Sequence, residues 1–420
     1  MAVLVTGGAG YVGSHTVLAL LDAGEKVFVI DDLSSGERSA VPIKAQFVHG
    51  DAGDPEMVRR LLRIYGIDAV VHMAGSGSVE ESVRNPLKHY RNNTEIARTV
   101  MEACVSEGVR HFVFSSTAAV YGDAEGCRED SVLSPVSPFG KSKLMAEAML
   151  RDTAAAHSIR YAALRCFNAA GADPAGRAGQ GARSGGLIEV ACEAAAGKRL
   201  FVPVFGTDYD TPDGTCVRDY IHVSDLADIH RLALERLRQG GSSFAVNCGY
   251  GRGRSVREVI ETVKKVSGVD FAVKVHPRRA GDVGKSVADC GMLFGDLGWR
   301  PSRDNLAKIV SHSLEWERNS SRLPARPAMH PEKLQKDQAG SATDLTPREH
   351  QVMQQLSKGL QNKIIAANLG VSEHTVKIHL HHIIRKLGAT NRTGAAAIYL
   401  ERLPDFFQRS NGAPSGFRNH

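Results

Sequence analysis

A glycine-rich segment near the start of the chain constrains the fold more than any other feature. The segment Thr6–Gly13 (TGGAGYVG) follows an apolar run and opens a helical stretch. Gly7 allows a tight turn, Gly10 lets a phosphate approach the helix N-terminus, and Gly13 lets the helix pack closely on the strand. Free N–H groups and the dipole at that N-terminus favour an anion. The segment therefore predicts a strand, a nucleotide-binding turn and a helix in succession.

Short apolar runs alternate with helical stretches from residue 2 to about residue 315. The predicted strands are Val3–Thr6, Val27–Asp31, Phe47–Gly50, Ala69–Met73 and His111–Ser116. This alternation predicts an α/β fold with a parallel, doubly wound Rossmann sheet. We assign residues 1–318 to this nucleotide-binding domain. We expect a small α/β substrate subdomain within it, mainly in residues 169–205 and 245–315.

An acidic residue ends the second predicted strand. Asp31 follows the glycines by about 20 residues, which is the usual position of a carboxylate that binds a ribose. Its oxygens would accept hydrogen bonds from the ribose 2′-OH and would repel a 2′-phosphate. The expected cofactor is therefore NAD rather than NADP.

Composition and cysteine spacing exclude several classes of protein. The 420 residues are 42% hydrophobic and 23% charged, and the net charge of +6 tolerates an anionic partner without requiring one. No apolar run approaches the ~20 residues of a membrane span, and Met1 leads directly into a strand rather than a signal peptide. The seven Cys lack CxxC spacing, which argues against a metal site and a disulfide framework and favours a reducing, cytoplasmic compartment.

A helix that begins near Ser137 carries a proton-shuttle motif without its proton donor. Residues at i and i+4 share a helical face, so a Tyr at position 139 would lie beside the Lys143 ammonium. The ammonium would favour the phenolate and lower the Tyr pKa toward neutrality. Position 139 is Phe, which has no titratable proton. The motif resembles the Tyr-x-x-x-Lys arrangement of short-chain dehydrogenases, with the acid/base atom missing.

The resemblance extends over residues 2 to about 315 and is most specific for the UDP-glucose 4-epimerases, an extended branch of that family. The matching segments are Gly7–His15, Gly50-Asp51, His72–Gly75, Asn92-Asn93, Phe114–Asp123, Leu164–Gly171, Asp213–Asp228 and Pro277–Asp282. The resemblance implies a homodimer that keeps NAD bound and interconverts UDP-glucose and UDP-galactose. In that family a Tyr moves the 4-OH proton, a Ser or Thr shares its hydrogen bond, and a Lys holds the ribose and lowers the Tyr pKa.

The family's site residues carry over to the matching positions of this chain. The implied catalytic positions are Thr117, Phe139 in place of the Tyr, and Lys143. The implied cofactor positions are Gly7, Gly10, Tyr11, Val12, Gly13, Asp31, Asp51, Ala74, Asn93, Lys143 and Phe167. The implied UDP-sugar positions are Thr117, Asn168, Leu187, Arg218, Arg279, Asp282 and Ser286. The chemistry of Arg218 and Arg279 supports this assignment independently of the family, because a guanidinium binds a diphosphate bidentately.

Two positions depart from the family pattern. Phe139 removes the acid/base group, and such a loss typically lowers the rate by about 10²–10⁴-fold, or roughly 3–5 kcal/mol of barrier. Thr117 cannot replace it, because an unassisted aliphatic hydroxyl is too weak an acid. Cys166 replaces a Tyr that precedes Phe-Asn in the family, and we interpret that change as one of packing.

The C-terminal part of the chain has a different character. Residues 319–343 are polar, contain Pro and show no periodicity, which predicts a linker. Residues 344–405 are predicted to form a separate all-α domain, and residues 406–420 a tail. A helix at Asn362–Leu369 and another from Ser372 to about Leu387 are joined by a tight turn, which predicts a helix-turn-helix.

This stretch resembles the LuxR-type DNA-binding domain over nearly all of residues 344–400. The matching residues are Leu345–Glu349, Gly359-Leu360, Asn362-Lys363, Ile365-Ala366, Val371–Lys377, His379-Leu380, Lys386–Gly388 and Asn391–Thr393. Glu373, His374, Lys377 and His381 share one face of the recognition helix and would meet base edges or phosphates in the major groove of double-stranded DNA. Lys363, Thr375 and Arg392 would contact the DNA backbone.

Three hypotheses follow for the whole chain. In the favoured one, the epimerase-like domain binds NAD and a UDP-sugar, turns over slowly or not at all, and controls DNA binding as part of a transcriptional regulator. In the second, the chain is an active UDP-glucose/UDP-galactose 4-epimerase with a DNA-binding domain attached. In the third, an accidental fusion has joined two halves that do not communicate.

Overall fold

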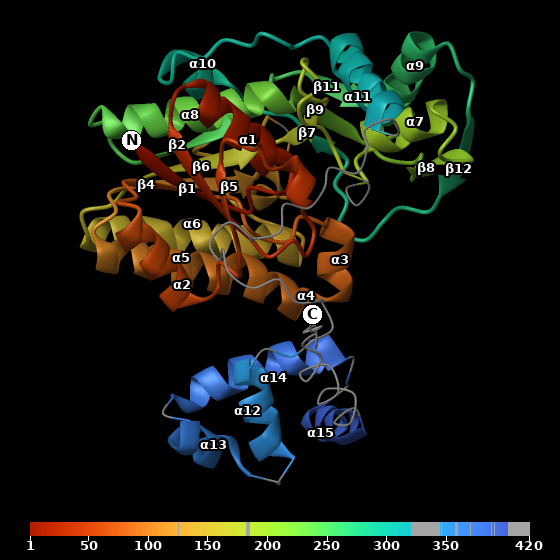
Figure 1. The fold of residues 1–420 in the computed structure, drawn as a ribbon. Coiled ribbons are helices and arrows are strands. Elements are labelled where there is room, and N and C mark those ends of the chain that lie inside the picture. Colours follow the sequence, from red (N-terminus) through yellow and green to blue (C-terminus); the bar gives the residue numbers. More distant parts are fainter. Residues whose placement is uncertain are drawn as a thin grey trace, which may run out of the picture. The chain divides into compact units, whose positions relative to one another are not determined.

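The chain forms two compact units, Met1–Ala328 and Met329–His420, which are described separately. The computed structural model describes residues 1–124, 126–181, 185–320, 345, 347–357, 360–369, 371–387, 389 and 391–401 (Figure 1). The predicted linker therefore lies outside the described residues from residue 321 onward, and the predicted tail lies outside them entirely. Helix α11 (Leu306–Ser320) extends two residues into the range predicted as linker.

Seven parallel strands form the central sheet of the first unit. They are β1 (Ala2–Thr6), β2 (Lys26–Asp31), β3 (Gln46–His49), β4 (Ala69–His72), β5 (His111–Thr117), β6 (Arg160–Cys166) and β10 (Phe244–Cys248). Their order is β10-β6-β5-β4-β1-β2-β3, and every pairing is parallel. From β1 the chain adds β2 and β3 on one side, and then returns to add β4, β5, β6 and β10 on the other side of β1. The predicted doubly wound Rossmann sheet is confirmed.

Helices cover both faces of this sheet because alternate strand residues point to opposite sides. Val3 and Val5 belong to one buried core and Leu4 to the other. Figure 1 shows α1 (Tyr11–Asp22) and α8 (Val223–Arg238) above the sheet and α2 (Pro55–Ile64), α5 (Ile96–Glu107) and α6 (Pro138–Ala156) below it. The shorter helical segments of this unit are η1 (Arg38–Ala40), α3 (Val79–Arg84), α4 (Pro86–His89), η2 (Tyr90–Glu95), η3 (Ala118–Val120) and α10 (Gly291–Gly295).

Smaller sheets lie beside the central one. One contains β11 (Gly253–Ser255), β9 (Val217–His222) and β13 (Lys285–Ser286), with β7 (Asn168–Ala170) also paired to β9. The other pairs β8 (Phe201–Phe205) with β12 (Ala272–His276). Helices α7 (Leu187–Ala195), α9 (Val256–Ser267) and α11 pack with them. Most of these elements lie in the ranges where the substrate subdomain was expected. Strand β9 lies between the two ranges, β7 begins one residue before the first, and α11 ends five residues after the second.

The second unit is helical. It consists of α12 (Pro347–Leu356), α13 (Asn362–Leu369), α14 (Glu373–Leu387) and α15 (Arg392–Glu401). Ser372 caps α14 by accepting a hydrogen bond from the Thr375 N–H at 3.1 Å. Apolar residues from all four helices, including Met353, Ile365, Ile383 and Tyr399, form one buried core. The predicted helix-turn-helix is confirmed as α13 and α14. Within the described residues, no helix of either unit is both long enough and apolar enough to cross a bilayer.

Candidate functional site

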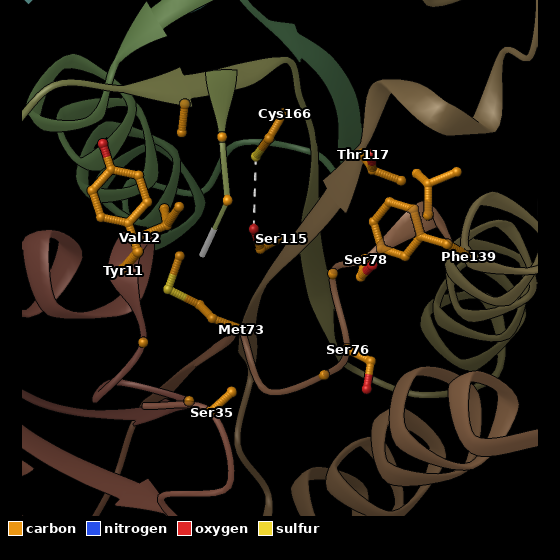
Figure 2. Close-up of a pocket in the computed structure, with 18 of the residues that line it drawn as sticks. Tyr11, Val12, Ser35, Met73, Ser76, Ser78, Ser115, Thr117, Phe139 and Cys166 are labelled. Atoms are coloured by element: carbon orange, nitrogen blue, oxygen red, sulfur yellow. Dashed lines mark hydrogen bonds between the residues drawn. The ribbon is translucent and has the colours of Figure 1, made fainter. Parts of the chain in front are cut away.

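A cavity of about 1370 Å³ opens at the carboxyl ends of the parallel strands. Ligands in doubly wound folds bind at this edge, where the strand order reverses. The predicted residues that line the cavity are Gly7, Gly10, Tyr11, Val12, Gly13, Asp31, Asp51, Ala74, Thr117, Phe139, Lys143, Phe167, Asn168, Leu187, Arg218, Arg279, Asp282 and Ser286. Figure 2 shows Tyr11 and Val12 on one side of the cavity and Thr117 and Phe139 on the other. Residues distant in sequence are therefore brought to one site.

The glycine-rich turn leaves no room for side chains. Gly7 has a φ of +72°, and a Cβ there would lie 2.6 Å from the Ala74 backbone nitrogen. A Cβ on Gly13 would overlap the carbonyl oxygen of Gly7. The turn therefore presents bare backbone and the N-terminus of α1 to the cavity, an arrangement that fits the diphosphate of a dinucleotide.

Asp31 lies at the end of β2 with only 8% of its surface exposed. Its two carboxylate oxygens accept hydrogen bonds from the N–H groups of Ala9 and Leu33, both at 2.9 Å. Burial raises the pKa of this carboxyl above its ordinary value, and the two backbone donors oppose that shift. Each oxygen has a second lone pair, so the fixed carboxylate can still accept a ribose hydroxyl.

Asn93 is the predicted site residue that does not line the cavity. It is fully buried in η2, and its side-chain oxygen accepts a hydrogen bond from the Ser76 N–H at 2.7 Å. Its amide nitrogen donates to the Ser76 carbonyl at 3.1 Å and to the Ser142 hydroxyl at 2.9 Å. Asn93 therefore holds the loop that follows β4 against α6. These contacts give Asn93 a positioning role, and its direct contact with the cofactor stays a prediction.

The proton-shuttle motif occupies the first turns of α6. Ser137 caps this helix by accepting a hydrogen bond from the Gly140 N–H, so Phe139 and Lys143 share its inner face. The Lys143 ammonium donates to the Ser115 carbonyl at 2.9 Å and lies 4.9 Å from the centre of the Phe114 ring. Burial lowers the pKa of Lys143 to about 8. The Phe139 ring is 9% exposed and lines the cavity. The motif therefore keeps its cation and has no phenol.

Two cationic side chains line the cavity, Arg218 from β9 and Arg279 from the segment that follows β12. The Arg218 guanidinium donates to the carbonyls of Val217 and Val283 at 3.0 and 2.7 Å. Arg279 donates to the Asp282 carboxylate at 3.0 Å and stacks 4.5 Å from the centre of the Phe205 ring. Ser286 is the register partner of Arg218 on the neighbouring strand. Two separate segments thus bring a guanidinium to one wall.

The sequence reasoning missed Glu189, which lines the cavity from the first turn of α7. Its side chain is 4% exposed, and one oxygen accepts hydrogen bonds from the N–H groups of Gly185 and Gly186 at 2.7 and 3.2 Å. Burial and the nearby Glu193 raise the pKa of this carboxyl to about 8. A Glu three residues after a glycine N-cap is a recognisable capping pattern, although sequence alone does not reveal that the carboxyl is buried.

The predicted DNA contacts lie in or next to the helix-turn-helix. Lys363, Glu373 and Lys377 are exposed, and the Lys377 ammonium lies 3.2 Å from the Glu373 carboxylate. Thr375 bonds to Ser372 through the two hydroxyls at 2.8 Å. The side chains of His374 and His381, both within α14, lie outside the part of the chain that is described.

The Arg392 guanidinium is hydrogen-bonded within the domain. It is exposed, but its guanidinium donates to the Leu360 carbonyl at 3.1 Å and approaches the Asn362 side chain at 3.4 Å. It therefore ties the start of α15 to the start of α13. Its predicted contact with the DNA backbone would have to share the guanidinium with this connection.

Two sequence profiles match the chain. The NAD dependent epimerase/dehydratase family matches residues 3–249, and the luxR family of bacterial regulatory proteins matches residues 343–399. A UDP-glucose 4-epimerase from Azospirillum brasilense is 54% identical over 320 residues, which cover 76% of this chain and 92% of that protein.

Solved structures also resemble the chain. A UDP-glucose 4-epimerase from Brucella ovis in complex with NAD is 41% identical with a TM-score of 0.72, covering 76% of this chain and 98% of the other. A UDP-glucose 4-epimerase from Bifidobacterium longum in complex with NAD⁺ and UDP is 33% identical with a TM-score of 0.72, again covering 76% and 98%.

Proposed function

The chain belongs to the NAD-dependent epimerase/dehydratase family and carries a LuxR-type domain, and we propose that it is a transcriptional regulator. Its epimerase-like unit binds NAD and a UDP-sugar with little or no turnover, and this binding controls the DNA-binding domain. Phe139 carries the proposal, because it places an inert ring at the cavity position where the family has its acid/base Tyr.

The cavity supports simultaneous binding of a dinucleotide and a sugar nucleotide. Its volume of about 1370 Å³ exceeds the roughly 300–1,000 Å³ of most single-ligand pockets. The glycine turn and Asp31 suit the diphosphate and ribose of NAD, which when bound would provide a hydride acceptor. Arg218 and Arg279, on the other wall, suit the diphosphate of a UDP-sugar. The solved relative from Brucella ovis is in complex with NAD, and the one from Bifidobacterium longum is in complex with NAD⁺ and UDP.

The remaining polar groups near the motif do not replace the missing base. The Thr117 hydroxyl would hydrogen-bond the sugar, but an aliphatic hydroxyl without an activating base is a poor proton acceptor and a weak acid. Lys143 is protonated at neutral pH, since its pKa is about 8, and it donates to the Ser115 carbonyl. It is arranged to hold a ligand hydroxyl rather than to remove a proton. Ligand binding should therefore persist where epimerisation is slow.

The full-length chain tests this proposal directly. We expect NAD to be retained by the purified chain and released when the chain is denatured, or to bind in calorimetry where the site is empty, and we expect calorimetry to detect binding of UDP. Conversion of UDP-galactose to UDP-glucose should be about 10²–10⁴-fold slower than in relatives with the Tyr. The DNA ligand for a gel-shift titration can be selected by the chain from a random duplex pool. Its affinity should change when NAD and UDP-glucose are added.

Each alternative predicts a different result. Turnover as fast as that of Tyr-containing relatives would contradict the proposed regulator and favour an active epimerase. DNA affinity that stays constant while calorimetry shows ligand binding would indicate two halves that do not communicate. Failure of both NAD and UDP to bind would reject the ligand-binding unit itself.

Lys363 provides a prediction for the DNA-binding domain that needs no knowledge of the operator. The side chain is exposed on α13, where it would neutralise a phosphate. We expect Lys363→Ala to weaken binding to duplexes of every sequence to a similar degree and to reduce the slope of log affinity against log salt by about one. The control is Lys44→Ala, which removes an exposed charge from the first unit. Equal effects of both variants would contradict a phosphate contact at Lys363.

A further inference from the structure

The cavity wall contains a thiol for which the proposed function has no use. Cys166 ends β6, is half-buried, and lines the cavity. Figure 2 shows its sulfur directed toward the Ser115 hydroxyl, and the two atoms are 3.6 Å apart. The packing interpretation of Cys166 does not explain why a polar group is placed at this point of the wall.

A second thiol lies beside the first. Cys248 ends β10 and is the register partner of Cys166 on the adjacent parallel strand. Each sulfur donates to the carbonyl two residues earlier, at 3.4 Å for Cys166 and 3.7 Å for Cys248, so both thiols lie on the same face. Adjacent strands are about 4.8 Å apart, which is within the ~4.4–6.8 Å that Cα atoms span in a disulfide.

A buried imidazole completes the cluster. His230 of α8 is fully buried, and its Nδ1 lies 2.9 Å from the Leu226 carbonyl. That contact assigns the proton to Nδ1 and leaves Nε2 with a lone pair. Within the described residues, Nε2 makes no hydrogen bond. Helix α8 packs against β6, and His230 contributes to the lowered pKa of Cys166, so this imidazole is the candidate proton acceptor for the thiol.

The two thiols differ in accessibility and acidity. The Cys166 pKa lies well below its ordinary value because of the neighbouring Cys248 thiol, with further contributions from His230 and Ser115. The Lys143 ammonium and the Cys166 thiolate also stabilise each other. Burial raises the Cys248 pKa well above its ordinary value. Cys166 lines the cavity and is therefore the thiol that can react with a molecule there, whereas Cys248 does not line the cavity and lies beside Cys166.

We propose that Cys166 is a peroxide-reactive thiol and that Cys248 resolves its oxidised form as a disulfide. The Cys166 thiolate attacks one oxygen of hydrogen peroxide, the O–O bond breaks, and the departing hydroxide takes the thiol proton from His230 to leave as water. In the resulting sulfenic acid, the Cys248 sulfur forms the S–S bond as the S–O bond breaks, and its proton leaves with the hydroxyl as a second water. Two thiols are oxidised and one peroxide is reduced. This reactivity does not depend on the proposed regulatory function.

Mass spectrometry of the intact full-length chain tests the assignment. After brief treatment with hydrogen peroxide, we expect a disulfide joining the Cys166 and Cys248 peptides. Cys248→Ser should instead accumulate a sulfenic acid at Cys166 that dimedone traps, and Cys166→Ser should abolish both products. Iodoacetamide at pH 7 should alkylate Cys166 about tenfold faster than Cys248.

Cys104 provides the internal control, because it is fully buried and burial raises its pKa well above the ordinary value. Cys104→Ser should leave the oxidation pattern unchanged, and tryptophan fluorescence should verify that each variant is folded. The proposal is overturned if peroxide oxidises Cys104 or another thiol before Cys166. It is also overturned if Cys166 remains a thiol in the folded Cys248→Ser chain.

Discussion

Phe139→Tyr is expected to accelerate conversion of UDP-galactose to UDP-glucose by about 10²–10⁴-fold, the usual contribution of general acid/base catalysis. The substitution restores a phenol to a helix that already positions Lys143 one turn later. The Lys143 ammonium would favour the phenolate and lower the pKa of the new Tyr. Thr117, on the same side of the cavity, would share the hydrogen bond to the sugar. In our proposal, the chain binds its ligands without turning them over because it lacks one hydroxyl, that of a Tyr at position 139.

The measurement is the initial rate at saturating UDP-galactose, with binding of NAD and UDP measured on the same preparations. Phe167→Tyr is the matched control, because it adds a hydroxyl to the same cavity without Lys143 one turn away. Adding Lys143→Met to Phe139→Tyr should remove most of the gain. An unaltered chain as fast as the Phe139→Tyr variant would show that Phe139 does not limit the rate.

Local chemistry explains why the sequence predicted the central sheet and the glycine turn. The bare turn at Gly7 and Gly13 and the apolar strand before it are properties of a few adjacent residues. The carboxyl ends of parallel strands must meet at one edge, so Asp31 and Thr117 lie at the same edge of the sheet. The helix-turn-helix was predictable for a similar reason, since the N-cap at Ser372 and the turn before it depend only on a few adjacent residues.

The remaining site features depend on contacts between distant segments. The sequence does not show that the Asn93 amide bonds to Ser76, or that Arg392 connects to Leu360. The low exposure of Glu189 likewise depends on packing among α7, α9 and α11. Cys166 was interpreted as packing because its neighbours Cys248 and His230 lie far away in sequence. Roles set by burial and by remote partners were the ones that the sequence did not reveal.

Glu189→Gln is expected to stabilise the first unit by about 3–5 kcal/mol above pH 8 and to have little effect near pH 4. The carboxyl keeps its proton to about pH 8 in the folded chain and loses it near its ordinary pKa of 4.5 when unfolded. Between these values the folded state binds more protons, so the free energy of unfolding falls as pH rises. Gln is neutral throughout, and its side-chain oxygen can still accept from the N–H groups of Gly185 and Gly186.

Urea unfolding monitored by tryptophan fluorescence at a series of pH values measures this difference. The two Trp residues of the chain, Trp299 and Trp316, both lie in the first unit, so the signal is specific to it. Glu261→Gln is the matched control, because Glu261 is exposed on α9 and its replacement removes the same charge. A Glu189→Gln variant whose stability falls between pH 4.5 and 8 as steeply as that of the unaltered chain would locate the titrating group elsewhere. If the free energy of unfolding no longer falls between pH 4.5 and 8 in the Glu189→Gln variant alone, the Glu189 carboxyl is the group that stays neutral at physiological pH. A charge at this point of the cavity wall would repel a bound diphosphate.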